Sequence, residues 1–216
     1  MFTSIKRQIS NFFTGVTIFR DSTDPCVPKI YLSDAKFAQS LDKIDDWDKL
    51  GIGLILNVTL EDPADDEIRQ VYSDLGIDYI WLPIRDSYDA LPPYYINDII
   101  TYVQNWTNLL CDYPTMFNMD EQEFYGISSG PNFNSKLNPN PGISNRNNIL
   151  IHCSAGINRS GLVAAAILWY TTPNRETLWK KPQDLIDYMR NRQVKDRRIY
   201  LLTNRSFVQY LNDNLV

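Results

Sequence analysis

The sequence predicts a single α/β domain in which a mainly parallel sheet is flanked by helices. Short apolar runs of strand length alternate along the chain with longer segments whose apolar residues recur at helical spacing, a pattern typical of this class. The chain has 216 residues, of which 44% are hydrophobic, so it is long enough for one domain with a core and too short for two ordinary domains. No internal repeat interrupts this pattern.

Four apolar runs are expected to form the strands, and five longer segments the helices. The strands are Ile30–Leu32, Leu54–Val58, Tyr79–Leu82 and Ile149–His152. The helices are Ala64–Leu75, Ile96–Leu110, the Ala-rich Leu162–Tyr170, Pro182–Arg192 and Thr203–Asn214. The apolar residues of the Ile96–Leu110 segment fall on one face, which indicates a stripe that packs on the core.

Residues 1–28 are predicted to form an amphipathic helix and a linker, ahead of the main domain at residues 29–216. Phe2, Ile5 and Phe12 fall on one helical face, and only Lys6 and Arg7 accompany them as basic residues. We expect this helix to pack on its own domain or to join two copies in a homodimer. Membrane contact is a weaker alternative because so few basic residues are available.

Residues 112–147 form an insertion that is rich in Asn, Pro, Ser and Gly and far longer than an ordinary connection. Two interpretations stay open. The insertion is a tolerated loop, or its aromatic residues fold over one side of the active cleft and help to select substrate. These aromatic residues are Phe117, Phe124, Tyr125 and Phe133.

The chemistry of the chain is concentrated in the turn that follows the last predicted strand. It reads His152-Cys153-Ser154-Ala155-Gly156-Ile157-Asn158-Arg159-Ser160. A loop between a buried strand and a helix gathers unpaired backbone N–H groups, which bind an anion together with the helix dipole. Gly156 allows the tight curve, and Arg159 can offer two parallel donors to a tetrahedral oxyanion.

The same donors are expected to lower the pKa of Cys153 into a range of roughly 3.5 to 7.5, so that the thiol is ionised at neutral pH. Ser160 can hydrogen-bond the sulfur and steady it as a leaving group. The opposing interpretations are a buried structural cysteine for Cys153 and a surface salt bridge for Arg159, although a helix start disfavours a cation. His152 is the only histidine, so catalytic triads and zinc sites have no other imidazole to use.

The pattern of His152-Cys153, five residues, then Arg159-Ser160 resembles the signature of the cysteine-dependent protein tyrosine phosphatases, and the whole chain resembles their dual-specificity branch. The flanking segments agree. Lys29–Ala35 resembles the opening strand and turn of that branch, Gly53–Thr59 its second strand, and Asn204–Phe207 its last helix. The resemblance implies a dual-specificity phosphatase-like fold. It also implies that residues 154–159 hold the phosphate. We expect His152 to be mostly structural, with a hydrogen bond to the loop backbone that orients Cys153.

Departure of an alkoxide or phenoxide from phosphorus needs a general acid on another segment of the chain. Asp86 follows Pro83 by three residues, as the acid does in the family. Asp89 precedes the pair Pro92-Pro93 by three residues, which is the spacing in some relatives. Asp86 is preferred, and the alternative for either residue is a helix cap or a turn.

The implied reaction is metal-free and needs no cofactor: Cys153 attacks phosphorus, Arg159 and the loop hold the oxygens, Asp86 handles the protons, and Ser160 helps the thiolate to leave. The expected substrate is a phosphorylated protein carrying phosphotyrosine, phosphoserine or phosphothreonine. The phosphotyrosine-clamping motif of the tyrosine-specific branch has no counterpart here, which implies a shallower pocket.

Three alternatives to a protein phosphatase stay open. The Ile157-Asn158-Arg159 sequence is similar to that of RNA 5′-triphosphatases of the same superfamily, although Ser154-Ala155 argues against them because Thr-His is usual there. Phosphoinositide phosphatases usually carry lysines in the loop, where this chain has neutral residues. A binding module without activity would usually lack the cysteine, the arginine or the acid, and all three are present.

Charge and cysteine content limit the partners and the compartment. A net charge of −5 is not typical of a protein that binds nucleic acid over its whole surface. Cations gather in the final third, where they form either a positive rim for a polyanionic substrate or a solvated helix face. Three cysteines, Cys26, Cys111 and Cys153, form no paired framework, and no secretory signal or run of twenty apolar residues is present. We expect an intracellular protein of the cytoplasm, or of the nucleus.

Overall fold

The structure is a computed structural model that describes residues 15–21, 27–61, 63–86, 93–112 and 146–215. Its centre is a five-stranded sheet in the order β1-β2-β5-β3-β4. All neighbouring strands are parallel except β1, which is antiparallel to β2. The strands are β1 (Thr17–Arg20), β2 (Ile30–Asp34), β3 (Ile52–Asn57), β4 (Asp78–Trp81) and β5 (Asn148–Cys153).

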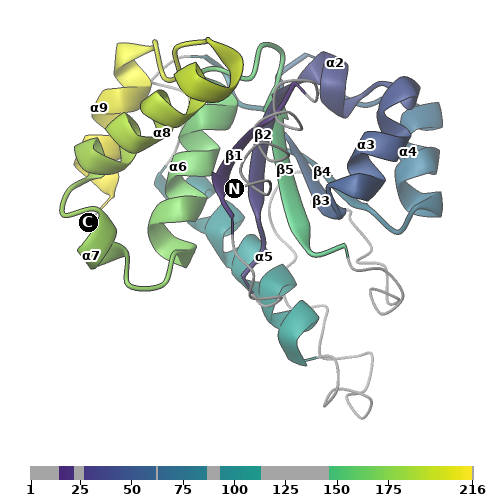
Figure 1. The fold of residues 1–216 in the computed structure, drawn as a ribbon, viewed down its shortest axis with the longest axis horizontal. Helices are drawn as coiled ribbons and strands as arrows, with labels where there is room; N and C mark the ends of the chain where they lie inside the picture. The colour runs from purple at the N-terminus through teal and green to yellow at the C-terminus, as the bar shows by residue number, and fades with distance from the viewer. Residues whose placement is uncertain (1–14, 22–26, 62, 87–92, 113–145, 216) are drawn as a thin grey trace, which may run out of the picture.

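Helices cover both faces of the sheet, as Figure 1 shows. One face carries α2 (Ala35–Ala38), α3 (Ile44–Lys49) and α4 (Asp66–Asp74), with the short 3-10 helix η1 (Leu41–Lys43) between α2 and α3. The other face carries α5 (Pro93–Asp112), α6 (Arg159–Thr171), α8 (Pro182–Arg197) and α9 (Arg205–Asn214), with α7 (Arg175–Leu178) beside them. This three-layer arrangement confirms the predicted fold class.

The core consists of two hydrophobic clusters, one on each face of the sheet, because side chains alternate along a strand. On β3, Leu54 and Leu56 belong to the cluster under α5, α6, α8 and α9, whereas Ile52 and Ile55 belong to the cluster under α2, α3 and α4. All six residues of β3 and of β5 are buried. A strand buried on both faces is rigid, and β5 therefore provides a fixed platform for Cys153 at its end.

Two helices beside the site, α2 and α9, begin at a polar cap. The Asp34 side chain accepts a hydrogen bond from the backbone N–H of Phe37 at 2.9 Å, which caps α2. The Asn204 side chain accepts one from the N–H of Ser206 at 2.9 Å, which caps α9. Such caps satisfy backbone donors that a helix start leaves unpaired.

The sheet begins earlier than the sequence predicts. Thr17–Arg20, which we assigned to a linker, forms β1 at the edge of the sheet, with Thr17 opposite Leu32 and Ile18 opposite Tyr31. Phe19 then enters the larger hydrophobic cluster. Four residues at an edge are too few to give a clear periodic pattern, which is why this strand was missed.

Several expectations concern residues outside the described ranges. The predicted amphipathic helix, and the homodimer that it would form, lie outside these ranges. So do Cys26, the aromatic residues of the insertion and the side chain of Cys111. α5 continues to Asp112, so the helix ends where the insertion was expected to begin. No helix within the described ranges is both long and apolar enough to cross a membrane.

Candidate active site

The predicted phosphate loop joins the carboxyl end of β5 to the start of α6. β5 ends at Cys153 and α6 begins at Arg159. Because β5 lies between β2 and β3, Cys153 is in the middle of the sheet, in register with Asp34 of β2. In open parallel sheets, ligands bind outside the carboxyl ends of the strands, which is where this loop lies.

Three backbone carbonyls of the loop are held outward by hydrogen bonds from neighbouring elements. Ser154 O accepts from the Ala35 N–H at 3.3 Å, and Ile157 O accepts from the Leu202 N–H at 3.1 Å. Gly156 O accepts from the Gln193 side chain at 2.9 Å. In a trans peptide the C=O and the following N–H point in opposite directions. The donors that these contacts turn inward are the N–H groups of Ala155, Ile157 and Asn158.

Gly156 is required at the bend of this loop. Its φ is +66°, in the left-handed region that glycine alone adopts at little cost. A Cβ added there would lie 2.4 Å from the backbone oxygen of Ser33, far inside contact distance. The loop therefore packs against β2 with no room for a side chain, which keeps its curvature fixed.

Cys153 lies beside this loop and is only 3% exposed. Burial raises the pKa of the Cys153 thiol. Hydrogen bonds lower it by more, so that the net pKa is below the ordinary value. The donors are the Ser160 hydroxyl and the backbone N–H groups of Gly156, Ile157 and Ser160. The Ser160 Oγ lies 3.2 Å from Sγ. The site thus favours a thiolate in a largely enclosed place.

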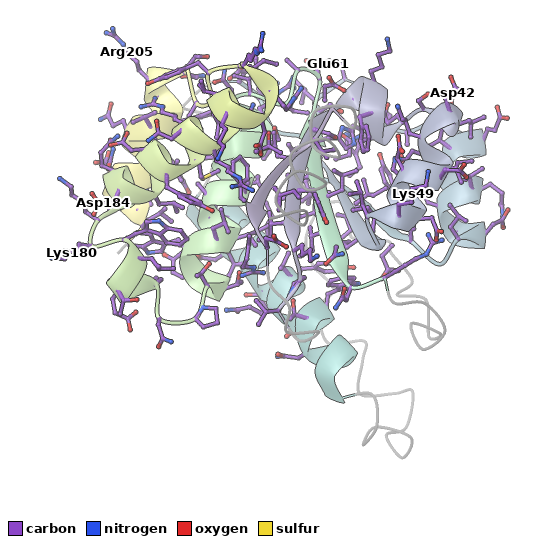
Figure 2. All side chains as sticks on the ribbon, in the orientation of Figure 1. Asp42, Lys49, Glu61, Lys180, Asp184 and Arg205 are labelled. Carbon is purple, nitrogen blue, oxygen red and sulfur yellow. The ribbon has the colours of Figure 1, made fainter. Side chains whose placement is uncertain are left out.

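Arg159 lies beside the loop with its guanidinium already held in place. Its Nη2 donates to the Ser154 Oγ at 2.9 Å, and its Nη1 donates to the backbone oxygen of Ile84 at 3.4 Å. Glu61 approaches the same guanidinium at 4.0 Å, but that carboxylate is 74% exposed and screened by water. Figure 2 shows Glu61 at the edge of the molecule where the strands end. Arg159 is therefore preorganised mainly by its two hydrogen bonds.

Asp86 is brought to the loop by a residue that we did not single out, Asn204. The Asn204 Nδ2 donates to the Asp86 Oδ1 at 2.9 Å, and its backbone N–H donates to the Asn158 Oδ1 at 3.0 Å. Asn158 also accepts from the Thr203 hydroxyl at 3.1 Å. One asparagine thus joins the exposed Asp86 to the phosphate loop. The rival acid, Asp89, lies outside the described residues.

These contacts also account for Asn158, the residue that suggested RNA chemistry. Its side-chain oxygen is occupied by the Thr203 hydroxyl and the Asn204 backbone. These contacts connect the loop to the turn before α9.

His152 is fully buried and neutral. Burial lowers the pKa of its imidazole to about 3, against a smaller opposing effect of the Cys153 backbone. Among the described residues, neither ring nitrogen has a partner at ordinary hydrogen-bond geometry. The expected hydrogen bond to the loop backbone is therefore not seen at that geometry, although the Cys153 backbone still affects the pKa of the ring.

Some cations of the final third bind backbone oxygens of the protein itself. Arg192 donates to the backbone oxygen of Ile18 at 2.9 Å, and Arg190 donates to that of Leu202 at 2.7 Å. Figure 2 shows Lys180 and Arg205 at well separated places on the helical side of the molecule. Several of these side chains therefore tie helices to loops. No three His, Cys, Asp or Glu side chains of the described ranges lie close enough to hold a metal ion.

The sequence predicted the loop itself but not the residues that hold it. Asn204 carried one local signal, since an asparagine before an apolar periodic segment is typical of a helix cap. Gln193 and Arg197 of α8 carried none, because each looks like any polar residue on a helix. Asp34 was part of a segment resemblance only. Gln193 and Arg197 reach the Gly156 carbonyl, and Asp34 reaches Arg197, only in the folded chain.

No family model matches the chain, and no curated protein matches it. Solved structures do. The chain is similar to OH1 from the Orf virus, a tyrosine phosphatase with triple substrate specificity, at 14% identity over 100% of this chain and 98% of that one, with a TM-score of 0.52. It is similar to the Yvh1 phosphatase domain from Chaetomium thermophilum at 14% identity, over 91% and 94% of the two chains, with a TM-score of 0.54.

Human DUSP28 is similar at 12% identity over 92% of each chain, with a TM-score of 0.52. At such low identity the likeness concerns the fold. The chain has the fold of the dual-specificity and tyrosine phosphatases, which confirms the architecture that the sequence predicts.

Proposed function

We propose that this protein is a cysteine-dependent phosphatase that hydrolyses phosphotyrosine, phosphoserine and phosphothreonine in proteins. The observation that carries the proposal is the Cys153 sulfur, which is buried in a ring of donors that lower its pKa. A structural cysteine would not need convergent N–H groups, an arginine and an aspartate around it. The shared fold with known phosphatases supports the proposal.

In the first step the Cys153 thiolate attacks phosphorus in line with the leaving oxygen. The S–P bond forms, the P–O ester bond breaks, and Asp86 donates its proton to the departing alkoxide or phenoxide. The loop N–H groups and Arg159 hold the equatorial oxygens, where negative charge is concentrated. The products of this step are the free alcohol and a phosphocysteine.

In the second step water attacks the phosphocysteine. Asp86, now ionised, accepts a proton from the water as the O–P bond forms. The S–P bond breaks, inorganic phosphate leaves, and Ser160 donates a hydrogen bond to the re-forming thiolate. Each proton taken from water restores Asp86 for the next cycle, so the residues suffice without a metal or cofactor.

A nucleophilic thiol requires reducing surroundings, and we therefore propose the cytoplasm or the nucleus as the place of action. Asn158 is neutral and its side-chain oxygen is occupied within the chain, so the loop offers no cation besides Arg159 that would favour an inositol headgroup or an RNA end.

The test is hydrolysis of an aryl phosphate by the wild type and by Cys153→Ser. We expect turnover by the wild type alone, and a phosphocysteine trapped by rapid acid quench. Parallel assays with phosphotyrosine and phosphothreonine peptides and with 5′-triphosphorylated RNA identify the substrate class. Turnover of the RNA alone would reject a protein phosphatase, and tight peptide binding without turnover would indicate a binding module.

A further inference from the structure

We propose that Arg197 and Gln193 of α8, together with Asp34 at the end of β2, form a positioning unit behind the phosphate loop that orients its donors and keeps Cys153 ionised. This inference rests on the proposed role of Cys153 as the nucleophile. The unit contacts no substrate, because it binds the outer side of the loop.

Gln193 and Arg197 are four residues apart on α8 and therefore lie on the same helix face. Both donate to one acceptor, the Gly156 carbonyl: Gln193 Nε2 at 2.9 Å and Arg197 Nη1 at 3.5 Å. With this carbonyl held outward, the N–H of Ile157 in the same peptide unit points to the Cys153 sulfur. The two side chains thus influence the thiolate by fixing the orientation of one peptide unit, the one between Gly156 and Ile157.

Arg197 also supplies a charge. Its side chain is 7% exposed, and its Nη2 lies 3.3 Å from the Asp34 Oδ2. Burial lowers the pKa of this guanidinium, while the negative charges of Asp34 and Cys153 raise it. Because an arginine stays protonated even so, a permanent cation lies buried beside the loop.

The two charges near Cys153 do not cancel. The Asp34 side chain is 34% exposed, so water screens part of its charge, whereas the Arg197 guanidinium is almost entirely enclosed. Asp34 still holds the guanidinium in place and caps α2 with its other oxygen. We therefore expect the charge of Arg197 to outweigh that of Asp34 at the sulfur, while Arg159 is left to bind the phosphate.

The test measures the alkylation rate of Cys153 by iodoacetamide against pH, read by mass spectrometry of the peptide that contains it. This readout needs no substrate and separates Cys153 from the other two cysteines. We expect the wild-type midpoint to fall below about 8.5, the value of a free thiol. Arg197→Met should raise the midpoint by about one unit or more, which is a tenfold loss of thiolate at lower pH.

Arg192→Met is the matched control, because Arg192 lies on the same helix, binds the Ile18 backbone oxygen at 2.9 Å and does not contact the loop. Its midpoint should equal that of the wild type. Asp34→Asn keeps an oxygen to cap α2 but removes a negative charge, so it should lower the midpoint. A unit that only packed the loop would instead raise the midpoint in both Arg197→Met and Asp34→Asn.

An unchanged midpoint in a folded Arg197→Met protein would overturn the inference, as would a raised midpoint in Asp34→Asn. If Arg197→Met does not fold, Arg197→Lys keeps the positive charge and can be measured in its place. Asp34→Asn still shows whether removing the negative charge lowers or raises the midpoint. A wild-type midpoint near that of an ordinary thiol would reject both this inference and the proposed function. A low midpoint without phosphatase turnover would reject the proposed function alone.

Discussion

At the scale of single residues, the site depends on short polar contacts around one sulfur. Burial by itself would make Cys153 a poorer acid, and the hydrogen bonds of the loop reverse that effect. Ser160 is fully buried and supplies one of these bonds from the first turn of α6. The catalytic value of each contact can be measured by removing it.

Ser160→Ala removes the hydroxyl 3.2 Å from the sulfur without changing the backbone donors. Hydrogen bonds to charged groups contribute about 1.5 to 3 kcal/mol, so we expect the phosphocysteine to break down roughly 10 to 100 times more slowly. A burst of aryl alcohol followed by a slow steady state should appear in rapid-mixing experiments. A steady state as fast as that of the wild type would show that the hydroxyl does not assist the leaving thiolate.

Gly156→Ala tests the fixed curvature of the loop. The added Cβ meets the Ser33 backbone oxygen at a positive φ, so we expect a loss of about 2 kcal/mol or more in the free energy of unfolding, together with loss of turnover. Urea unfolding and aryl phosphate hydrolysis measure the two effects.

Gly76→Ala provides the matched control. Gly76 has a φ of +67° and nothing within 4 Å of an added Cβ, so the change costs about 1 to 2 kcal/mol of stability and leaves turnover intact. Equal losses in the two variants would mean that the loop yields to a side chain at position 156.

At the scale of elements, the site is assembled where β5, α6, α8 and the turn before α9 meet. The sequence predicted β5 and α6 because an unbroken apolar strand and an Ala-rich helix have strong local patterns. It missed β1 because four edge residues show no period. It also missed the tie from α8 to Gly156, since Gln193 and the loop are far apart in sequence and only tertiary packing brings them together.

Asn204 has two separable roles, which a pair of variants can distinguish. Asn204→Asp keeps an oxygen to cap α9 but loses the amide that donates to Asp86 and adds repulsion. We expect kcat to fall about tenfold or more, with stability changed by less than about 0.5 kcal/mol. Asn204→Ala should lower both kcat and stability, the latter by about 1 kcal/mol. Unchanged kcat in Asn204→Asp would argue against Asp86 as the general acid.

At the scale of the whole molecule, one titrating group connects the active site with acid stability. The folded protein holds the His152 pKa at about 3, below the ordinary value of 6.5, so the unfolded chain binds the extra proton first. Stability is therefore complete above about pH 6.5 and falls as the pH drops toward 3. The slope from this residue approaches about 1.4 kcal/mol per pH unit, or about 2 kcal/mol between pH 6.5 and 5.

His152→Gln should flatten this dependence between pH 6.5 and 5, whatever its effect at neutral pH. Urea unfolding at several pH values checks it, and the chain has no second histidine to obscure the result. An equally steep slope in the variant would place the acid sensitivity on other groups.

The overall architecture was predictable because alternation of strands and helices, chain length and one dense motif all indicated the same answer. The sequence could not show how strongly the charges of Arg197 and Asp34 act on the loop, because that depends on how far each side chain is buried. Nothing in the sequence distinguishes Arg197 from Arg192 or Arg198, yet the Arg197 side chain is 7% exposed and is held between Asp34 and the Gly156 carbonyl.

His152 is the only histidine and is fully buried, which makes its imidazole a useful spectroscopic probe. As the sole histidine, it should give one set of imidazole resonances in a sample labelled at histidine only. Vanadate titration, loop variants and slow opening events could then be followed through this one side chain, which precedes Cys153 in the sequence.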